Sequence, residues 1–241
     1  MATIVVLGVV LVVSGLGFGW YALRPLAVLP RLLRSEVVAP AEVSADSGFV
    51  VCRGRAESVG ESLDGPFTGE PCLGVEYEIA ERALTPSEVP FTWRDLDDGV
   101  ATVPFELRGD SDRVRVEPES RRFALDTEPE TVVVPAGERP PERIESFLAV
   151  REGVGPASAG PLSVLGIGTR RYVERRIDLD EPHVIAGRPE RTDGRTVLTG
   201  ALVITDRSPR AVVGRRLRAA ALPLAVALVF CVLGVALIAI S

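Results

Sequence analysis

The side chains that most often perform covalent chemistry are few in this sequence. There is one histidine, His183, and there are three cysteines, Cys52, Cys72 and Cys231. A nucleophile needs a base within hydrogen-bonding reach, and His183 has no cysteine or serine near it in the sequence. We therefore expect His183 to be structural, and we expect no catalytic residue, no cofactor and no metal site.

Two pairs of carboxylates are the next candidates for chemistry. Asp97 lies beside Asp98, and Glu128 is two residues from Glu130. General acid and base catalysis needs one member of such a pair to be buried, so that its pKa shifts. Both pairs lie in segments that resemble loops of an acidic domain, and we expect them to be surface charges.

The run that begins at Asp95 resembles a calcium loop, because Glu106 is its twelfth residue. An EF-hand loop has glycine at its sixth position and a helix on each side. Here the glycine is the fifth residue, and a strand is expected to follow. We interpret Asp98-Gly99 as a turn instead.

Alternating apolar residues define the elements that must position any site. Between Gly99 and Pro118, alternation on both sides of Gly109–Asp112 predicts a β-hairpin with one buried face, formed by Ala101, Val103, Phe105, Leu107, Val114 and Val116. Other strands are expected at 48–56, 72–80, 91–94, 122–126, 131–135, 169–179, 182–187 and 194–206, and 144–150 could be helix or strand. Many short strands with turns between them predict a mainly β fold, an OB-like or barrel-like domain.

Both ends of the chain are apolar. Thr3–Leu23 and Ala219–Ile240 contain no ionisable side chain and are long enough to cross a bilayer as helices. The first has no positive residue before it, so we interpret it as a retained anchor rather than a signal peptide. Gly15 and Gly19 have the spacing of a helix-packing motif, which could contact Ala225 or Gly234, or form a helix–helix oligomer with another copy.

Arginines border the inner edge of each apolar end. They are Arg24, Arg31 and Arg34 after the first, and Arg207, Arg210, Arg215, Arg216 and Arg218 before the second. Positive flanks remain on the cytoplasmic side of a membrane. We therefore predict a two-span, multi-pass protein of the cell membrane, with a cytoplasmic central domain, both termini outside and membrane lipid as one partner. Residues 24–34 could lie among headgroups or be a plain linker.

The central stretch is strongly acidic. With the eight flanking arginines set aside, 19 arginines remain against 33 acidic residues, a net charge of −14. This charge disfavours nucleic acid as a partner. The chain has no lysine, and an acidic surface with arginine as the only cation suggests a salt-loving source. Reduced, buried thiols are expected at Cys52 and Cys72, since a cytoplasmic disulfide is rare.

The expected organisation has five parts. These are a transmembrane helix at 1–23, a juxtamembrane segment and linker at 24–46, the β-domain at 47–206, an arginine-rich segment at 207–218 and a second transmembrane helix at 219–241. Within the domain, Tyr172 and Glu174 share one face of a strand, and Arg171, Arg175 and Ile177 share the other. A recognition strip and a solvated face with a cross-strand ion pair both fit this pattern, and we favour the solvated face.

An ordered set of short motifs carries a resemblance. The motifs are Val51–Ala56, Pro66–Cys72, Val103–Leu107, Val114–Pro118, Tyr172–Ile177 and Val184–Gly187. In this order they resemble the GIDE domain, also called BAM, of mitochondrial E3 ubiquitin and SUMO ligases, over roughly residues 45–206 and the two flanking helices. The residues that carry the pattern, all expected to be structural, are Gly54, Pro71, Cys72, Tyr77, Phe105, Pro118, Tyr172, Glu174 and Gly187.

The resemblance implies a RING-less member of that family. In the eukaryotic ligases a RING follows the second membrane helix, and a RING requires eight Cys or His ligands for two zinc ions. This chain has three cysteines and one histidine and stops after the helix. The expected function is a non-catalytic, membrane-tethered scaffold that recruits another protein. One alternative is a ubiquitin-ligase subunit that acts with a RING from another chain. An OB-type nucleic-acid binder is disfavoured by the charge and by the 5% aromatic content.

Overall fold

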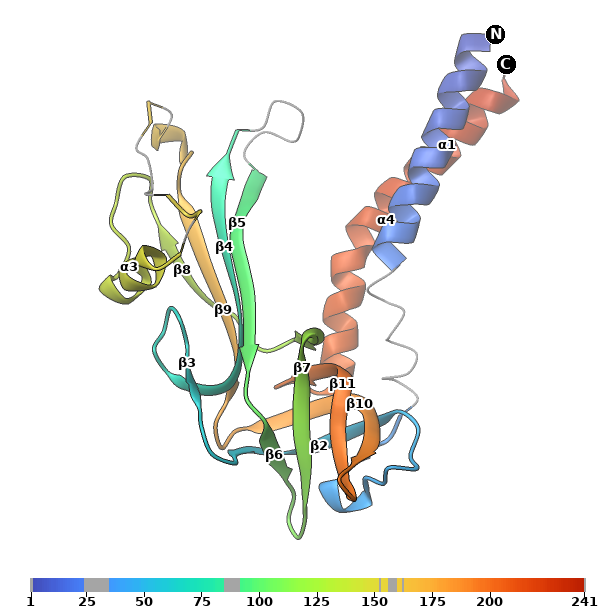
Figure 1. Ribbon diagram of the computed structural model, residues 1–241. Coiled ribbons are helices and arrows are strands. Elements are labelled where there is room, and N and C mark those ends of the chain that lie inside the picture. Colours follow the sequence, from blue (N-terminus) through green and yellow to red (C-terminus); the bar gives the residue numbers. More distant parts are fainter. Residues whose placement is uncertain are drawn as a thin grey trace. The chain divides into compact units, whose positions relative to one another are not determined.

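A computed structural model describes residues 2–23, 35–84, 92–151, 153–155, 160–161 and 163–240. They form two units, a helical one from the two ends of the chain and a β-rich one from Val37 to Arg207 (Figure 1). Three arginines of the predicted membrane flank, Arg24, Arg31 and Arg34, lie outside the described residues.

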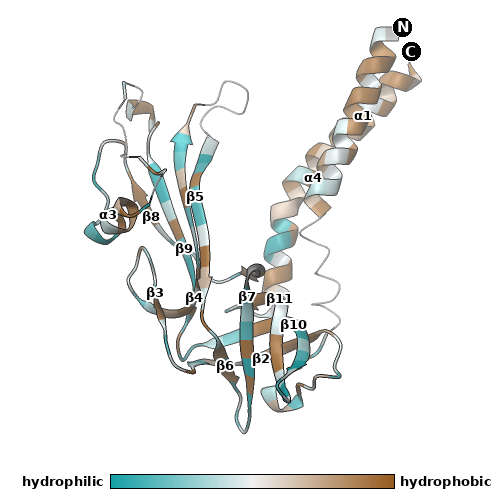
Figure 2. Ribbon diagram, viewed as in Figure 1, coloured by the Kyte–Doolittle hydropathy of each residue, from teal (hydrophilic) through white to brown (hydrophobic). Residues whose placement is uncertain are grey.

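The helical unit consists of α1 (Ala2–Leu23) and α4 (Pro209–Ala239). Both helices are long and apolar enough to cross a membrane (Figure 2). Helix α4 begins earlier than expected, because Ser208 caps it by accepting a hydrogen bond from the amide of Ala211 at 3.4 Å. The arginine-rich juxtamembrane segment predicted at 207–218 is therefore helical from Pro209 onward. It contains Arg210, Arg215, Arg216 and Arg218.

Small residues allow α1 and α4 to pack closely. A Cβ atom on Gly15 would lie 2.8 Å from the carbonyl oxygen of Ala227, and one on Gly234 would lie 2.6 Å from that of Gly8. Backbones approach this closely only where side chains are absent. Gly15 thus faces Ala227 and Cys231 of its own chain, rather than Ala225 or Gly234. Pairing of two copies through Gly15 and Gly19 stays a prediction.

The first sheet of the β unit curls on itself. Its strands lie in the order β1 (Val37–Val38), β2 (Val50–Ser58), β10 (Pro182–Thr192), β11 (Arg195–Thr205), β7 (Arg113–Leu125) and β6 (Phe105–Arg108), and β2 also pairs with β6. The β11–β7 pair is parallel, and the other pairs among β2, β6, β7, β10 and β11 are antiparallel. The short helix η2 (Pro40–Glu42) follows β1.

The second sheet contains β3 (Leu63–Asp64), β4 (Pro71–Ala83), β9 (Arg170–Asp178) and β8 (Glu130–Val134) in that order, with β5 (Thr92–Thr102) paired to β4. Helix α3 (Glu142–Ala149) resolves the ambiguity over 144–150 in favour of a helix, and η3 (Ser163–Leu165) precedes β9. The side chain of Ile144 in α3 is fully buried, in one apolar cluster with Phe67, Tyr77, Ile79, Val134 and Tyr172.

The predicted central hairpin is confirmed in its second half. Phe105 pairs with Val116 and Leu107 pairs with Val114, and all four side chains are buried. The first half is wrong as a single strand, because β5 ends at Thr102 and β6 begins at Phe105 in the other sheet. Pro104 has no amide to donate to a ladder, which suits this crossing point. Ala101, expected inside, is exposed.

The predicted turn at Asp98-Gly99 is also wrong, since both residues lie within β5. Asp98 pairs with Glu78, and Gly99 pairs with Tyr77. A Cβ atom on Gly99 would lie 2.5 Å from the Tyr77 ring, so glycine allows this ring to lie across the strand. Turns occur instead at Asp180 and at Asp193-Gly194, with φ of 58°, 51° and 76°.

Replacing Gly54 with alanine tests the close contact of β2 with β6. A Cβ atom there would lie 2.6 Å from the carbonyl oxygen of Arg108, a backbone atom that cannot move away cheaply. We expect Gly54→Ala to lower the free energy of unfolding of the full chain in detergent micelles by about 1–3 kcal/mol. Gly60→Ala is the matched control, because no atom lies within 4 Å of the added carbon. Equal stability of the two variants would contradict the prediction.

Candidate functional site

The residues of the family pattern are distributed through the β unit. Phe105 belongs to the apolar cluster inside the curled first sheet, and Tyr77 and Tyr172 belong to the cluster under α3. Cys72 is fully buried beside Pro71 at the start of β4. Pro118 lies within β7, and Gly54 and Gly187 lie where a side chain would collide with Arg108 or Leu202.

Glu174 in β9 is the charged residue at the centre of the candidate site. It is 1% exposed, and its carboxylate accepts hydrogen bonds from the amide of Phe67 at 2.7 Å and from the hydroxyl of Thr68 at 2.5 Å. The guanidinium of Arg176 donates to it at 3.0 Å. The expected solvated face at Tyr172 and Glu174 is therefore wrong, because the loop of residues 65–70 covers it.

On the opposite face of β9, the expected cross-strand ion pair is present. Arg171 forms a cross-strand ion pair with Glu78 at 2.7 Å, and both side chains are about one-third exposed. Tyr172, Glu174 and Arg176 therefore lie inward, and Arg171 lies outward. The expected solvated face is wrong at Ile177, which is fully buried in the apolar cluster of the first sheet.

Arg176 is surrounded by acceptors. Besides Glu174, it donates to Glu70 and Glu130 at 2.9 Å and to Asp178 at 3.0 Å, as well as to the Thr68 hydroxyl. Burial opposes its charge, but the hydrogen bonds to Asp178 and Glu174 more than compensate and raise the pKa of the guanidinium. One cation therefore faces four carboxylates.

The loop of residues 65–70 is held from two sides. Its buried side meets Glu174, and the carbonyl oxygen of Gly65 accepts two hydrogen bonds from Arg143 of α3, at 2.9 and 3.1 Å. Gly65 lies so close to the Glu174 carboxylate that a Cβ atom would collide with it. The Glu174 carboxylate therefore holds the loop of residues 65–70 from one side, and the Arg143 guanidinium holds it from the other.

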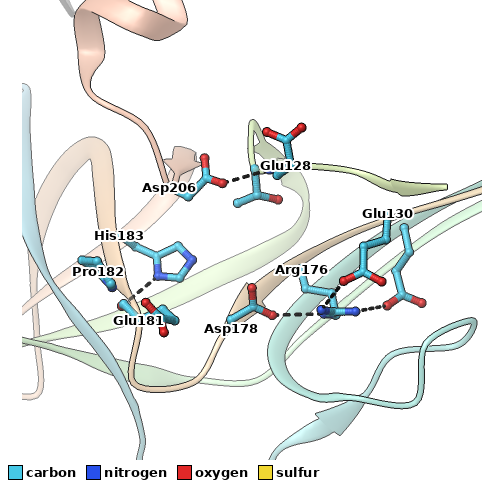
Figure 3. A pocket seen from close by; sticks show the side chains of 10 residues that line it. Glu128, Glu130, Arg176, Asp178, Glu181, Pro182, His183 and Asp206 are labelled. Carbon is cyan, nitrogen blue, oxygen red and sulfur yellow. Dashed lines mark hydrogen bonds and ion pairs between the residues drawn. The ribbon is translucent and has the colours of Figure 1, made fainter.

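Beside this network lies a polar pocket of about 330 Å³ (Figure 3). It is lined by Thr127, Glu128, Glu130, Glu174, Arg176, Asp178, Glu181, Pro182, His183 and Asp206. The residues come from β8, β9, β10 and the chain segments next to them. The lining combines titratable groups from both sheets of the β unit.

His183 contributes its imidazole ring to the lining of this pocket. The residue is 2% exposed, and its Nδ1 lies 3.0 Å from the carbonyl oxygen of Glu181. A carbonyl oxygen can only accept, so Nδ1 carries a proton and donates it to Glu181. Figure 3 shows the ring's other nitrogen facing the pocket, and no described residue forms a hydrogen bond with it.

Asp206 and Thr127 also line the pocket. The Asp206 carboxylate accepts a hydrogen bond from the amide of Glu128 at 3.0 Å. Burial raises the pKa of Asp206, and the nearby His183 partly offsets this rise. Thr127 is 4% exposed, and its hydroxyl has no hydrogen-bond partner among the described residues. Such an unsatisfied group is uncommon in a folded protein.

The two predicted carboxylate pairs have different surroundings. Glu128 and Glu130 lie on the rim of this pocket with side chains 70% and 54% exposed, as expected of surface charges. Glu128 pairs with Arg207. Asp97 and Asp98 lie elsewhere on β5, where the Asp97 carboxylate accepts a hydrogen bond from the Tyr77 hydroxyl at 3.3 Å.

Sequence reasoning missed Arg176, Asp178, Thr127 and Asp206 as members of this site. The position of Arg176 could have been predicted, because it is two residues from Glu174 and four from Tyr172, and side chains at this spacing in a strand share one face. Among the described residues, no three His, Cys, Asp or Glu side chains are arranged to hold a metal ion. No protein-family model matches the chain, and no curated protein matches it.

Replacing Glu174 with glutamine tests whether the buried ion pair holds the loop. The variant leaves the buried Arg176 without the carboxylate partner that is itself fully buried, and such losses cost about 3 kcal/mol. We expect this decrease in the unfolding free energy of the full chain, measured by denaturant titration in micelles.

Glu70→Gln is the matched control. Glu70 also pairs with Arg176, but its side chain is 65% exposed, and we expect a change of about 0.5 kcal/mol or less. If Glu70→Gln lowered the unfolding free energy as much as Glu174→Gln does, burial of the ion pair would not be the reason for the effect of Glu174→Gln.

The two cysteines of the β unit are free and buried, as expected. Burial raises the pKa of Cys52 to about 12 and that of Cys72 to about 11, from an ordinary value of 9.0. Burial also raises the pKa values of Tyr77 and Tyr172. All four groups lose a proton more readily when unfolded, so they favour folding fully below about pH 9 and progressively less above it.

We expect the melting temperature to fall as the pH rises from about 9 to 11. At pH 8, the folded chain should protect Cys52 and Cys72 from iodoacetamide, and the denatured chain should not. Peptide mapping by mass spectrometry separates these two sites from Cys231. Equal labelling of Cys72 in the folded and denatured chains would contradict this account.

Proposed function

We propose that this protein is a membrane-tethered interaction module without catalytic activity, a RING-less relative of the GIDE or BAM domain. The observation that carries the proposal is the arrangement along the chain, a β unit between two helices that are each long and apolar enough to span a bilayer. A unit anchored at both ends stays near the lipid surface. We infer that its task is to hold a partner protein there.

The strand pairing supports an OB-like barrel. Numbered by their order in the chain, β2, β6, β7, β10 and β11 pair in the ring 1-2-3-5-4-1, with one parallel pair between the third and fifth. This order of pairing is the one expected of a five-stranded Greek-key barrel. The second sheet and α3 are insertions between the first and second strands and between the third and fourth.

The chemistry of the pocket supports a binding role over a catalytic one. Its lining residues in the described structure include no serine or cysteine, and the Thr127 hydroxyl is buried. Activation of a nucleophile by His183 would need such a group within reach of Nε2. Arg176 is occupied by five hydrogen bonds from within the chain.

We propose that the β unit faces the cytoplasm and that both termini lie outside. The support is the set of arginines next to the apolar spans, which remain on the cytoplasmic side during insertion. Acidic residues occur only between Glu36 and Asp206, so they do not oppose this bias in the immediate flanks.

A membrane-impermeant crosslinker tests recruitment and sidedness together. Applied to inside-out vesicles from cells that express the full chain, it should recover a partner protein in stoichiometric amount. Right-side-out vesicles should give none. The control chain keeps both helices but carries an unrelated soluble domain in place of residues 37–207.

Repeated recovery of no partner from inside-out vesicles would overturn the recruiting function. Recovery from right-side-out vesicles alone would reverse the proposed orientation. If the captured partner is a RING protein, and ubiquitin-like conjugation is lost when residues 37–207 are replaced, the ligase-subunit alternative replaces the scaffold.

A further inference from the structure

A second pocket, of about 530 Å³, is lined by arginines. Arg53 and Arg55 of β2 and Arg108 of β6 line it together with Asp110, which supplies the one carboxylate among its lining residues. The central stretch of the chain has the opposite balance, with 33 acidic residues against 19 arginines. Charges of one sign that line a concave site reinforce one another, so this pocket attracts anions although the domain as a whole repels them.

The strand register places like charges directly opposite one another beside this pocket. Arg55 is opposite Arg108, and Arg108 is in turn opposite Arg113 of β7. Like charges in directly opposite positions destabilise a sheet. Ion pairs with Glu57 at 2.7 Å and with Glu106 at 3.3 Å offset the charges of Arg108 and Arg113, respectively. Arg55 is the member of this row that has no ion pair with a described residue.

Arg53 and Arg55 therefore carry charge that the chain does not neutralise. The guanidinium of Arg55 donates a hydrogen bond to the carbonyl oxygen of Asp180, which orients the side chain but carries no net charge. Arg53 is exposed and forms no hydrogen bond or ion pair with the described residues. Residues two apart in a strand lie on one face, with their Cα atoms about 7 Å apart. One anion can therefore contact both guanidinium groups.

Both ends of the β unit meet beside Arg53. Val38 of β1 and Ile185 of β10 both pair with Cys52, the residue before Arg53, and Ile204 of β11 pairs with Ile185. Val38 is the second residue of this unit, and Ile204 is three residues from its end. In a domain tethered at both ends, the part from which both connections leave is the part held closest to the lipid head groups.

We propose that this pocket binds a phosphate group, with Arg53 and Arg55 as its main hydrogen-bond donors and Arg108 at its edge. The inference rests on the membrane tethering of the proposed function, to which it adds a contact with lipid. Guanidinium groups bind phosphate oxygens in pairs of parallel hydrogen bonds. A phosphate has more oxygens than a carboxylate and can be shared by several arginines. The position of the pocket beside both connections favours a lipid head group as the source.

Chemical modification of arginine measures occupancy of the pocket residue by residue. The full chain is placed in nanodiscs of digalactosyldiacylglycerol, a lipid without phosphate, and treated with the neutral reagent phenylglyoxal. Peptide mapping by mass spectrometry follows each arginine. Addition of phosphatidylglycerol to the nanodiscs should slow modification of Arg53 about fivefold or more, because bound phosphate covers the guanidinium. Arg191 is the internal control, since it is exposed and does not line this pocket.

Soluble probes distinguish a lipid head group from a free phosphate ion. A tethered domain meets lipid phosphates at an effective concentration in the millimolar range or above, so a lipid site needs little intrinsic affinity. In nanodiscs without phosphate, glycerol 3-phosphate should therefore protect Arg53 only at about 10 mM or more. Protection by inorganic phosphate at about 0.1 mM would instead make the free ion the source. Acetate at equal ionic strength should protect less than glycerol 3-phosphate.

Arg55→Gln tests whether two guanidinium groups share the phosphate. We expect the concentration of glycerol 3-phosphate that half-protects Arg53 to rise about tenfold, because a charge-assisted hydrogen bond is lost. Arg191→Gln is the matched control, as it also removes one exposed arginine from the β unit, and it should leave this concentration unchanged. If Arg55→Gln does not fold, the comparison of lipids in the unmodified chain still decides.

Unchanged modification of Arg53 with every phosphate probe would overturn the proposal. Equal slowing at Arg191 would also overturn it, since that result indicates a general effect of an anionic surface. Protection by acetate equal to that by glycerol 3-phosphate would exclude specificity for phosphate. Recruitment is measured separately by crosslinking in vesicles, so recovery of a partner without protection of Arg53 would refute the phosphate site and leave the recruiting function intact.

Discussion

The ion pair between Glu174 and Arg176 is the interaction on which the second sheet depends. The Glu174 carboxylate accepts hydrogen bonds from the amides of Phe67 and Thr68 and so positions the Phe67 ring. That ring contacts the rings of Tyr77, Tyr172 and Phe147 edge-on, with 5.5–5.8 Å between centroids. A buried ion pair is costly to desolvate, and backbone donors are what make this one tolerable. The same ion pair therefore orders the loop of residues 65–70, the aromatic cluster around Phe67 and the surface against which α3 packs.

The two sheets also share one interior. Leu73 of β4 and Ile177 of β9 belong to the second sheet, yet both are fully buried in the apolar cluster of the curled first sheet. The chain crosses between the sheets at Pro104, and again at Asp180, whose amide donates to the carbonyl of Ala56 at 2.8 Å. Since neither sheet encloses its core without residues of the other, the β unit behaves as a single packing unit.

Much of the strand positioning follows from the sequence, because apolar alternation directly reflects one-sided burial. It holds for Phe105 with Leu107 and for Val114 with Val116. The apolar alternation fails to predict the acidic part of β5, because Asp98-Gly99 has the composition of a turn although its backbone pairs with β4. It fails for Glu174 as well, since the donors that make its burial possible come from residues more than a hundred positions away. The candidate pocket is likewise formed by residues far apart in the sequence, so local patterns could not predict it.

One consequence concerns the outer side of β5. Among the described strands, β5 pairs only with β4, so its other backbone edge remains available for hydrogen bonding. Edges of this kind can recruit strands from neighbouring molecules and begin aggregation. Asp95, Asp97 and Asp98 place three negative charges along it, and two copies brought edge to edge would repel each other. The acidic sequence that resembled a metal loop thus has a protective value, as it keeps crowded molecules from fusing their sheets.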